Sequence, residues 1–359
     1  MKLKKILIII QRSNGDVFYS NTLVNELKKI DQEFQIDLLV NSDTSPLANL
    51  INDVDKVIEF SYAKKHNDGK KYLIKLAKRI FKKYDISINL TSSDRSVFFA
   101  IISAKKSFSI IEKDFRKSWW KKILLDYYDY FYADRNILTQ TLLPLRLFNS
   151  NSSNNKLVSK IEPSEQDFKK VNKILEEVKI NDFIIFHPCA QYSYKVLPEA
   201  KIIKLVNMLS SIGLPVVISG GSSSIDKEIR KIIPKGKNIF NFIGKLNISE
   251  YIALSNLSKC YVGMDTLNMH IAYSQKKRVF AIFGPTNHKA WAPYAENYLS
   301  ALERNKGVAN YQNVTIFQAD MSCVPCGKAG CHDDKGRSLC MENIDIEKIY
   351  KAVKKWICD

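Results

Sequence analysis

Two short apolar runs, residues 261–263 and 278–283, lie on either side of one helix-length segment and constrain the fold more than any other feature. Runs that are short and apolar throughout are typical of strands buried on both faces of a parallel sheet. Each run ends in polar residues and glycine, where a helix is expected to begin. The stretch therefore predicts a strand-helix-strand unit with a ligand-binding edge at its strand ends.

The same alternation recurs along the chain. We expect further strands at residues 6–10, 36–40, 57–60, 86–90, 183–186 and 215–219, with helix-length segments between them. This pattern indicates an α/β protein with parallel sheets and helices on both faces. A chain of 359 residues is longer than a single domain with one hydrophobic core usually is, and the length suits two domains. The polar run at residues 149–164 is the natural linker between them. The predicted domains are residues 1–160 and 161–344, followed by a C-terminal helix in residues 345–359.

The chain is strongly basic, with a formal charge of +18 from 55 basic and 37 acidic residues. The charge is spread along the sequence, which predicts an anionic partner or surface. Nucleic acid, anionic lipid and phosphorylated sugar all satisfy this requirement, and a compositional bias toward lysine explains the charge equally well. No nucleic-acid recognition motif is present, so we expect no nucleic-acid partner.

The first residues place basic side chains before an apolar run and resemble a signal peptide. The run at residues 6–10 is too short for one and lacks a small-residue cleavage site, so a first strand is the better interpretation. No stretch approaches the ~20 apolar residues that span a bilayer. We expect a cytoplasmic monomer, bound at most to one face of a membrane.

Residues 117–148 are rich in aromatic and basic side chains. Read as a helix, the segment places six apolar residues on one side: Trp120, Ile123, Leu124, Tyr127, Tyr128 and Phe131. Such a stripe usually packs in a core, and core packing is the favoured interpretation. A membrane interface with lysines facing lipid phosphates is the alternative.

Four of the seven cysteines cluster near the C-terminus at Cys323, Cys326, Cys331 and Cys340. The first spacing suits metal chelation. A cytoplasmic protein keeps its thiols reduced, which argues against disulfides. A structural zinc ion and a reduced, metal-free loop both remain open.

Two strand ends in the first domain carry candidate site residues. Gly15-Asp16 follows the first strand, where helix capping is the ordinary role of an aspartate. Ser93 and Arg95 follow the strand at 86–90, and capping by Ser93 is again the simpler interpretation. Because strand ends gather at one edge of a parallel sheet, these residues are also placed to contact a ligand.

The sequence around the opening feature resembles the family 9 glycosyltransferases, the lipopolysaccharide heptosyltransferases. Their late domain carries D-T-G-x-x-H-x-A followed by G-P-T, and here residues 265–272 read DTLNMHIA and residues 284–286 read GPT. The resemblance covers residues 183–293 well and the first domain mainly at Gly15-Asp16. It implies a GT-B fold, in which two Rossmann-like domains have parallel sheets facing a central cleft and the last helix packs back on the first domain.

The resemblance also implies roles for individual residues. Asp16 matches the aspartate taken as the general base, and Lys195 is placed to neutralise the leaving diphosphate. The expected donor-binding residues are Lys195, Asp265, Thr266, Leu267, Asn268, His270, Gly284, Thr286, Gly220 and Asp226. The expected acceptor-binding residues are Ser13, Asn14, Ser93 and Arg95. For His270 a buried core position, and for Asp226 a plain helix surface position, are the simpler interpretations.

The implied activity is inverting transfer of heptose from ADP-heptose to the phosphorylated inner core of lipopolysaccharide, without a catalytic metal. Leu267 departs from the family pattern, because it replaces the glycine of D-T-G. A side chain there narrows the approach to the backbone. Another nucleotide sugar, a protein acceptor, and a non-catalytic nucleotide-sugar-binding protein therefore remain alternatives.

Overall fold

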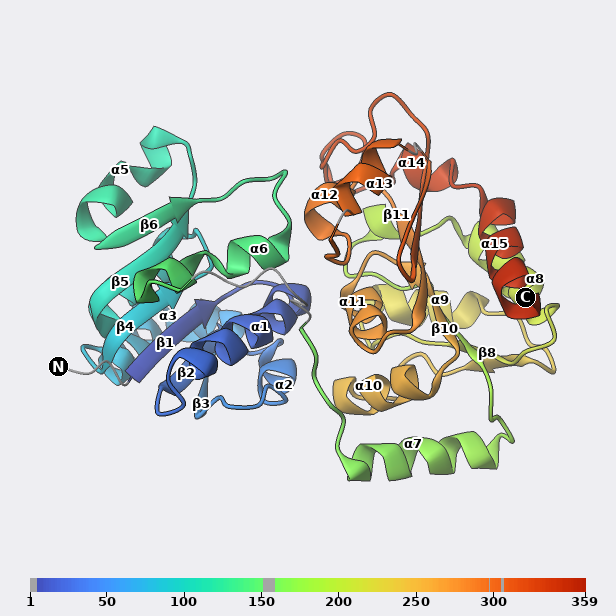
Figure 1. Ribbon diagram of the computed structural model, residues 1–359, viewed down its shortest axis with the longest axis horizontal. Coiled ribbons are helices and arrows are strands. Elements are labelled where there is room, and N and C mark those ends of the chain that lie inside the picture. The colour runs from blue at the N-terminus through green and yellow to red at the C-terminus, as the bar shows by residue number, and fades with distance from the viewer. Residues whose placement is uncertain (1–4, 151–158, 297, 305–306) are drawn as a thin grey trace. The chain divides into compact units, whose positions relative to one another are not determined.

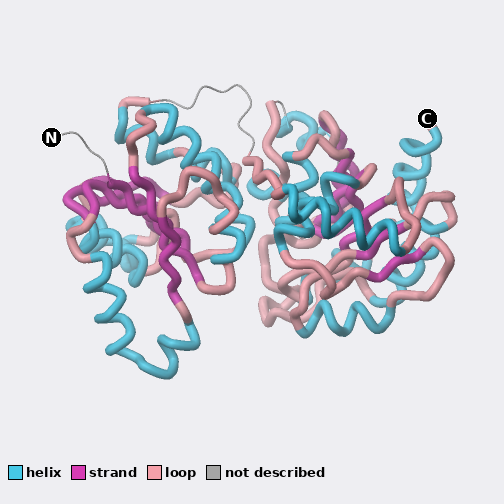
Figure 2. Tube along the Cα trace, turned by 90° about the horizontal axis from the view of Figure 1, so that it is seen from below, coloured by secondary structure: helices cyan, strands magenta, loops and turns pink. Residues whose placement is uncertain are grey.

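The computed structural model of the protein describes residues 5–150, 159–296, 298–304 and 307–359 (Figure 1). The chain divides into two compact units, Met1–Ile161 and Glu162–Asp359. In each unit the strands are flanked by helices (Figure 2). Part of the expected linker, residues 151–158, lies outside the described residues. Within the described parts of the chain, no helix is long and apolar enough to cross a membrane.

Unit 1 is built on a six-stranded sheet with the order β3-β2-β1-β4-β5-β6. All of its strand pairs are parallel. The strands are β1 (Lys5–Ile10), β2 (Gln35–Asn41), β3 (Lys56–Phe60), β4 (Tyr84–Asn89), β5 (Ala104–Ile111) and β6 (Tyr127–Tyr130). Strand β1 is central, and its residues from Ile6 to Ile10 are fully buried. The strand order reverses between β1 and β4, which is where open α/β sheets bind ligands.

The helical segments in the described residues of unit 1 are α1 (Asn14–Ile30), α2 (Ser45–Ala48), α3 (Tyr62–Ile80), α4 (Asp94–Ser103), α5 (Phe115–Leu124), α6 (Ile137–Thr141) and the 3-10 helix η1 (Leu143–Phe148). Helix α1 contacts α2, α6 and η1, whereas α4 contacts both α3 and α5. Leu7 and Ile9 of β1 pack with Leu76 of α3 and Phe99 of α4. Since side chains alternate along a strand, the other residues of β1 face the opposite helix layer.

The helical interpretation of the aromatic segment at residues 117–148 is wrong for the part that carries the apolar stripe. Helix α5 ends at Leu124, and β6 begins at Tyr127 as the edge strand beside β5. Ser107 anchors this pairing, because its backbone N–H and its hydroxyl donate to Asp126 Oδ2 at 2.8 and 2.9 Å. The expected buried stripe is largely exposed, with 71% of Ile123 and 55% of Leu124 accessible. Sheet pairing, which periodicity alone does not reveal, overrides the helical pattern here.

Unit 2 has a seven-stranded sheet with the order β12-β13-β11-β10-β7-β8-β9. Its strands are β7 (Ile184–His187), β8 (Val216–Ile218), β9 (Ile239–Asn241), β10 (Cys260–Met264), β11 (Arg278–Phe283), β12 (Val308–Tyr311) and β13 (Val314–Gln318). Edge strand β12 pairs antiparallel with β13, and the other pairs are parallel. The order reverses between β7 and β10. At this junction a Cβ on Gly263 would lie 2.6 Å from the carbonyl oxygen of His187, so only glycine fits.

The helical segments of unit 2 surround this sheet. They are α7 (Glu165–Glu177), η2 (Ser193–Lys195), α8 (Glu199–Ser210), α9 (Ser224–Ile232), α10 (Ile248–Leu257), α11 (Leu267–Ser274), α12 (His288–Trp291), α13 (Tyr298–Arg304), α14 (Leu339–Glu342) and α15 (Ile346–Cys358). Helix α11 joins β10 to β11, so the strand-helix-strand unit expected at residues 261–283 is present.

The C-terminal helix α15 buries its apolar face within unit 2. It lies against α8 in unit 2, and Ile349 and Val353 are fully buried in the core of that unit. Trp356 makes an edge contact with Phe280 of β11, with ring centroids 6.3 Å apart. The apolar face of α15 is thus used within unit 2, and the unit extends to Asp359.

Candidate active site

Asp16 lies in the first turn of α1, directly after the central strand β1. Its side chain is buried, and both carboxylate oxygens have partners: Arg12 Nε lies 2.9 Å from Oδ1, and Ser13 Oγ donates to Oδ2 at 2.7 Å. Ser13, rather than Asp16, occupies the N-cap position of the helix. An acidic group in the first turn is stabilised by the helix dipole. The carboxylate is therefore held in one orientation at the carboxyl edge of the sheet.

Arg95 is fixed at the same edge by contacts with the ends of two other strands. Its Nε donates to Gln11 Oε1 at 3.3 Å, and its guanidinium group lies 4.1 Å from the ring centroid of Phe60. Gln11 in turn donates its backbone N–H to Thr91 Oγ1 at 2.9 Å. The structure thus links the loops after β1 and β4, the two strands at which the order reverses.

The other predicted acceptor residues have simpler surroundings. Ser13 and Asn14 are exposed at the start of α1. Ser93 caps α4, because its hydroxyl oxygen accepts the backbone N–H of Ser96 at 3.3 Å, as the simpler interpretation held. Sequence reasoning assigned no role to Arg12 or Gln11, although both lie directly after the first strand, where an edge position was already expected.

In unit 2 the reversal point of the sheet holds an ion pair between Lys195 and Asp265. Lys195 Nζ lies 2.9 Å from Asp265 Oδ2, and the two side chains are 23% and 6% exposed. Lys195 comes from the loop after β7, and Asp265 follows β10. An ammonium group carries several N–H donors, so the pair leaves donors free for an anionic ligand. These two predicted donor-site residues are brought together.

His270 is buried in α11 beside this ion pair, so its predicted core position is confirmed. Burial lowers the pKa of its imidazole to about 4, although the negative charge of Asp265 opposes this shift. The ring is therefore neutral at pH 7 and adds no positive charge to the site. A contact between the neutral His270 and the donor stays a prediction.

His187, at the end of β7, ties this strand to the start of α11, and the sequence analysis assigned it no role. The Asn268 side-chain nitrogen lies 3.0 Å from Nδ1 of His187, and the Ser219 hydroxyl lies 3.0 Å from the same atom. Burial lowers the pKa of His187 to about 4. Thr266 is the N-cap of α11, and Leu267 is its half-buried first residue. The first N–H groups of a helix lack partners within it, which makes this end suited to anions.

The glycine-proline-threonine turn after β11 is supported by contacts with α14 and with the end of β13. A Cβ on Gly284 would lie 2.6 Å from the sulfur atom of Met341, so the turn packs directly on α14. Gln318, at the end of β13, donates its side-chain N–H to the carbonyl oxygens of Gly284 and Thr286 at 2.7 and 3.1 Å. Gln318 was missed because its strand was not predicted.

Gly220 lies in a closely packed loop after β8, and Asp226 lies in the first turn of α9. A Cβ on Gly220 would lie 2.6 Å from the Cys189 sulfur. Asp226 completes a capping box with Ser223: its carboxylate accepts the Ser223 backbone N–H at 2.9 Å, and its own N–H donates to the Ser223 hydroxyl. The side chain is buried, so the expectation of a solvated surface position is wrong. A contact between Asp226 and a ribose stays a prediction.

The cysteine cluster lies on the surface of unit 2. Cys323, Cys326 and Cys331 are exposed, Cys340 is buried, and all are free thiols. Burial, with the neighbouring thiols adding to it, raises the pKa of Cys340 to about 11. Among the described residues, no group of three His, Cys, Asp or Glu side chains is arranged to hold a metal ion. The zinc interpretation of the cysteine spacing stays a prediction.

Thiol titration with Ellman's reagent tests this arrangement. We expect the four exposed cysteines to react quickly in the folded protein, and the three buried ones only after unfolding. The thiolate is the reactive form, and access limits its reaction. Adding zinc before the reagent is expected to change neither class, with cadmium as a second probe. Protection of the cluster thiols by either metal, reversed by a chelator, would restore the zinc interpretation.

Comparison with known proteins adds independent information. Residues 73–319 match the model of "Glycosyltransferase family 9 (heptosyltransferase)", a range that contains Lys195 and Asp265 but not Asp16. The chain is 24% identical to lipopolysaccharide heptosyltransferase 3 of Escherichia coli K12, over 80% of this chain and 85% of that protein.

Two solved structures share the fold. A family 9 glycosyl transferase from Veillonella parvula superposes with a TM-score of 0.76 at 18% identity, covering 99% of this chain and 98% of its own. The E. coli ADP-heptose lipopolysaccharide heptosyltransferase II gives a TM-score of 0.71 at 15% identity, covering 98% of each chain. The predicted fold class, two Rossmann-like domains of GT-B type, is confirmed.

Proposed function

Because the chain belongs to glycosyltransferase family 9, we propose that it transfers heptose from ADP-heptose to the phosphorylated inner core of lipopolysaccharide. The observation that carries this proposal is the Lys195 and Asp265 pair at the reversal point of the unit 2 sheet. The names of the similar E. coli proteins, which include ADP-heptose and lipopolysaccharide, support the choice of donor and acceptor.

On the donor side, the chemical requirement is to stabilise the charge of the departing diphosphate. Lys195 supplies a fixed positive charge, and the first N–H groups of α11 supply donors with a favourable dipole. Asp265 accepts hydrogen bonds, which suits the hydroxyl groups of a sugar. The turn of Gly284 and Thr286, braced by Gln318, presents a further hydroxyl. In this mechanism these groups do the work that a metal ion does in other transferases.

On the acceptor side, a hydroxyl group must lose its proton as the new glycosidic bond forms. Asp16 is proposed as the general base, since its carboxylate is already oriented by Arg12 and Ser13. Attack from the face opposite the leaving diphosphate inverts the anomeric centre. Arg95 at the same sheet edge offers a cationic group to a phosphorylated acceptor, with Ser13, Asn14 and Ser93 as polar contacts.

The setting proposed for this reaction is the cytoplasmic face of the inner membrane, where the enzyme acts as a monomer. The net charge of +18 suits an acceptor rich in phosphate. Leu267, at the first position of α11, narrows the approach to the helix start, so the exact nucleotide sugar is the least constrained part of the proposal.

A comparison of nucleotides tests the donor. We expect ADP to raise the melting temperature, with smaller or no shifts for UDP, GDP and CMP, because a ligand at 100 times its Kd stabilises a protein by about 2.7 kcal/mol. Release of ADP from ADP-heptose is then measured with lipopolysaccharide that lacks the heptose. No shift with ADP would contradict the donor, and a shift without turnover would indicate a binding protein.

A further inference from the structure

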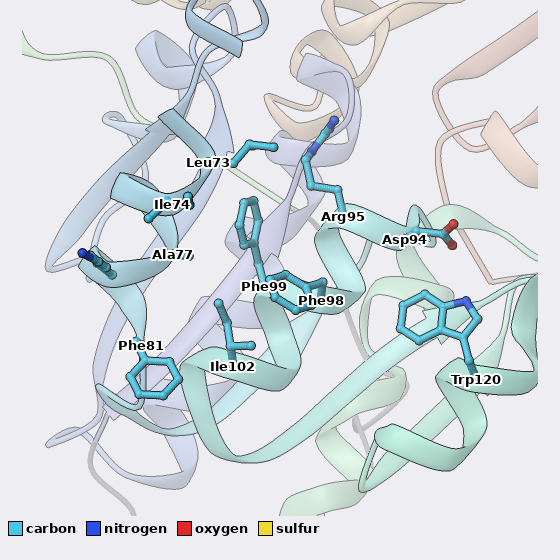
Figure 3. Close-up of a pocket in the computed structure, with 11 residues that line it drawn as sticks. Leu73, Ile74, Ala77, Phe81, Asp94, Arg95, Phe98, Phe99, Ile102 and Trp120 are labelled. Atoms are coloured by element: carbon cyan, nitrogen blue, oxygen red, sulfur yellow. The ribbon is translucent and has the colours of Figure 1, made fainter. Parts of the chain in front are cut away.

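An open apolar hollow of about 770 Å³ lies between α3, α4 and α5 in unit 1. In Figure 3, Phe98 and Ile102 of α4 stand between Ile74 and Phe81 on one side and Trp120 of α5 on the other. The side chains of Ile74, Phe81 and Phe98 are each more than half exposed. The proposed reaction uses none of these apolar groups.

The apolar surface continues along α5. Nine large apolar side chains in the described residues are at least half exposed, and eight of them belong to residues 62–124: Tyr62, Ile74, Phe81, Phe98, Phe115, Trp119, Ile123 and Leu124. The ninth, Leu339, lies in unit 2. Exposed side chains this concentrated mark an interaction surface rather than ordinary surface scatter. We call these eight residues the apolar patch.

A buried lysine explains why α5 turns its aromatic side outward. Lys121 is 1% exposed, and its Nζ lies 2.9 Å from Asp94 and 2.8 Å from Glu112. It also donates to the carbonyl oxygen of Ser92 at 2.6 Å. This network pins the polar side of α5 to the start of α4. Trp119 and Ile123 are consequently held in solvent.

Basic residues surround the apolar patch. Residues 62–83 contain nine lysines and arginines against one acidic residue, and residues 104–124 contain seven against two. Lys75, Lys78 and Lys117 are exposed, unlike Lys121. An apolar centre with a cationic rim matches a bilayer surface, which offers acyl chains beneath anionic phosphates. A second copy of the same face would bring two lysine-rich rims together, which is unfavourable.

We propose that the apolar patch and its lysine rim dock unit 1 on an anionic phospholipid bilayer. The apolar side chains enter the boundary between headgroups and acyl chains, and the lysines contact lipid phosphates. Arg95 lines this hollow and also contacts Gln11 at the Asp16 edge. If the proposed function holds, docking here presents a lipid-anchored acceptor close to that edge. Binding of the apolar patch to a bilayer does not require that the protein catalyses this reaction.

Flotation of the full-length protein with lipid vesicles tests the proposal. We expect binding to vesicles of phosphatidylethanolamine with phosphatidylglycerol, and about tenfold weaker binding to vesicles of phosphatidylcholine alone. The variant Ile74→Ser/Phe98→Ser/Ile123→Ser is expected to lose at least about tenfold in partitioning, since it removes apolar area that enters the bilayer. Its far-UV spectrum and its melting temperature are measured to confirm folding.

The matched control is Ile30→Ser/Leu339→Ser, which removes two exposed apolar side chains outside the apolar patch and should bind like the parent. A second variant, Lys75→Glu/Lys78→Glu, should weaken binding to anionic vesicles and lower its salt dependence. Unchanged binding of the triple Ser variant overturns the proposal. Equal binding of the parent protein to both vesicle types would also overturn it. A third contrary result would be a parent protein that does not bind vesicles but forms a dimer, and a triple Ser variant that is monomeric. The vesicles contain neither lipopolysaccharide nor ADP-heptose, so vesicle binding is measured independently of transferase activity.

Discussion

Asp16→Asn is expected to lower kcat by about 10²- to 10⁴-fold, the range that a general base contributes. The substitution keeps the shape of the side chain but removes its ability to accept a proton. Binding of ADP should be unchanged, because the proposed donor groups all lie in unit 2. The measurements are ADP release under saturating donor and acceptor, together with the ADP-dependent shift in melting temperature.

Asp167→Asn is the matched control for this experiment. Asp167 is also a buried aspartate in the first turn of a helix, where it completes the capping box of α7 with Ser164. Its substitution should lower the melting temperature and leave kcat unaffected. If Asp16→Asn behaves in the same way, with kcat within about twofold of the parent, Asp16 has only a structural role and the proposed mechanism fails.

Lys195→Met is expected to lower kcat/KM by about 10²- to 10³-fold and to weaken ADP binding, comparable with the loss of one electrostatic donor in other active sites. Two effects act in the same direction. The ammonium group no longer stabilises the diphosphate, and the buried Asp265 carboxylate is left without its partner and repels the ligand. Isothermal titration with ADP and initial-rate kinetics measure the two losses.

The double variant Lys195→Met/Asp265→Asn separates these effects. Removing the unpaired carboxylate should restore stability and part of the ADP affinity, so the two substitutions should not be additive. Turnover should stay low, because the positive charge is still absent. Lys245→Met, which removes an exposed lysine from the same unit, is the control and should bind ADP normally. Normal ADP affinity in Lys195→Met would remove Lys195 from the donor site.

The parts of the fold that the sequence predicted correctly are those with local signals. Residues 278–283 form β11 as expected, because an apolar run bounded by polar residues and glycine has few alternatives in a parallel sheet. Asp265 was expected at a strand end, and the resemblance assigned Lys195 to the same donor site. The carboxyl ends of the strands of one parallel sheet lie along one edge, which brings such residues together. The capping box of Asp226 was overlooked, although Ser223 precedes it by three residues and is a local signal for it.

The parts that failed depend on partners far away in the sequence. A lysine such as Lys121 is expected at the surface, but its ion pairs with Asp94 and Glu112 bury it. As a result, α5 exposes its aromatic side to solvent instead of burying it. The contact of His187 with Asn268 depends on two strands lying side by side, which no local pattern encodes. Helix α15 is amphipathic wherever it packs, so its periodicity predicts a buried face without saying which unit buries it.

The contact between Gly284 and Met341 has a consequence for how this chain can vary. The turn that carries Thr286 rests on a side chain contributed by α14, near the C-terminus, with no room for even one extra carbon atom. A side chain at position 284 therefore requires the flexible Met341 side chain to move or to be replaced by a smaller one, and the two positions should covary among homologues. The same contact means that shortened versions of the chain ending before Met341 would lose the support of the turn. Helix α14 thus supports the turn that we propose as part of the donor site.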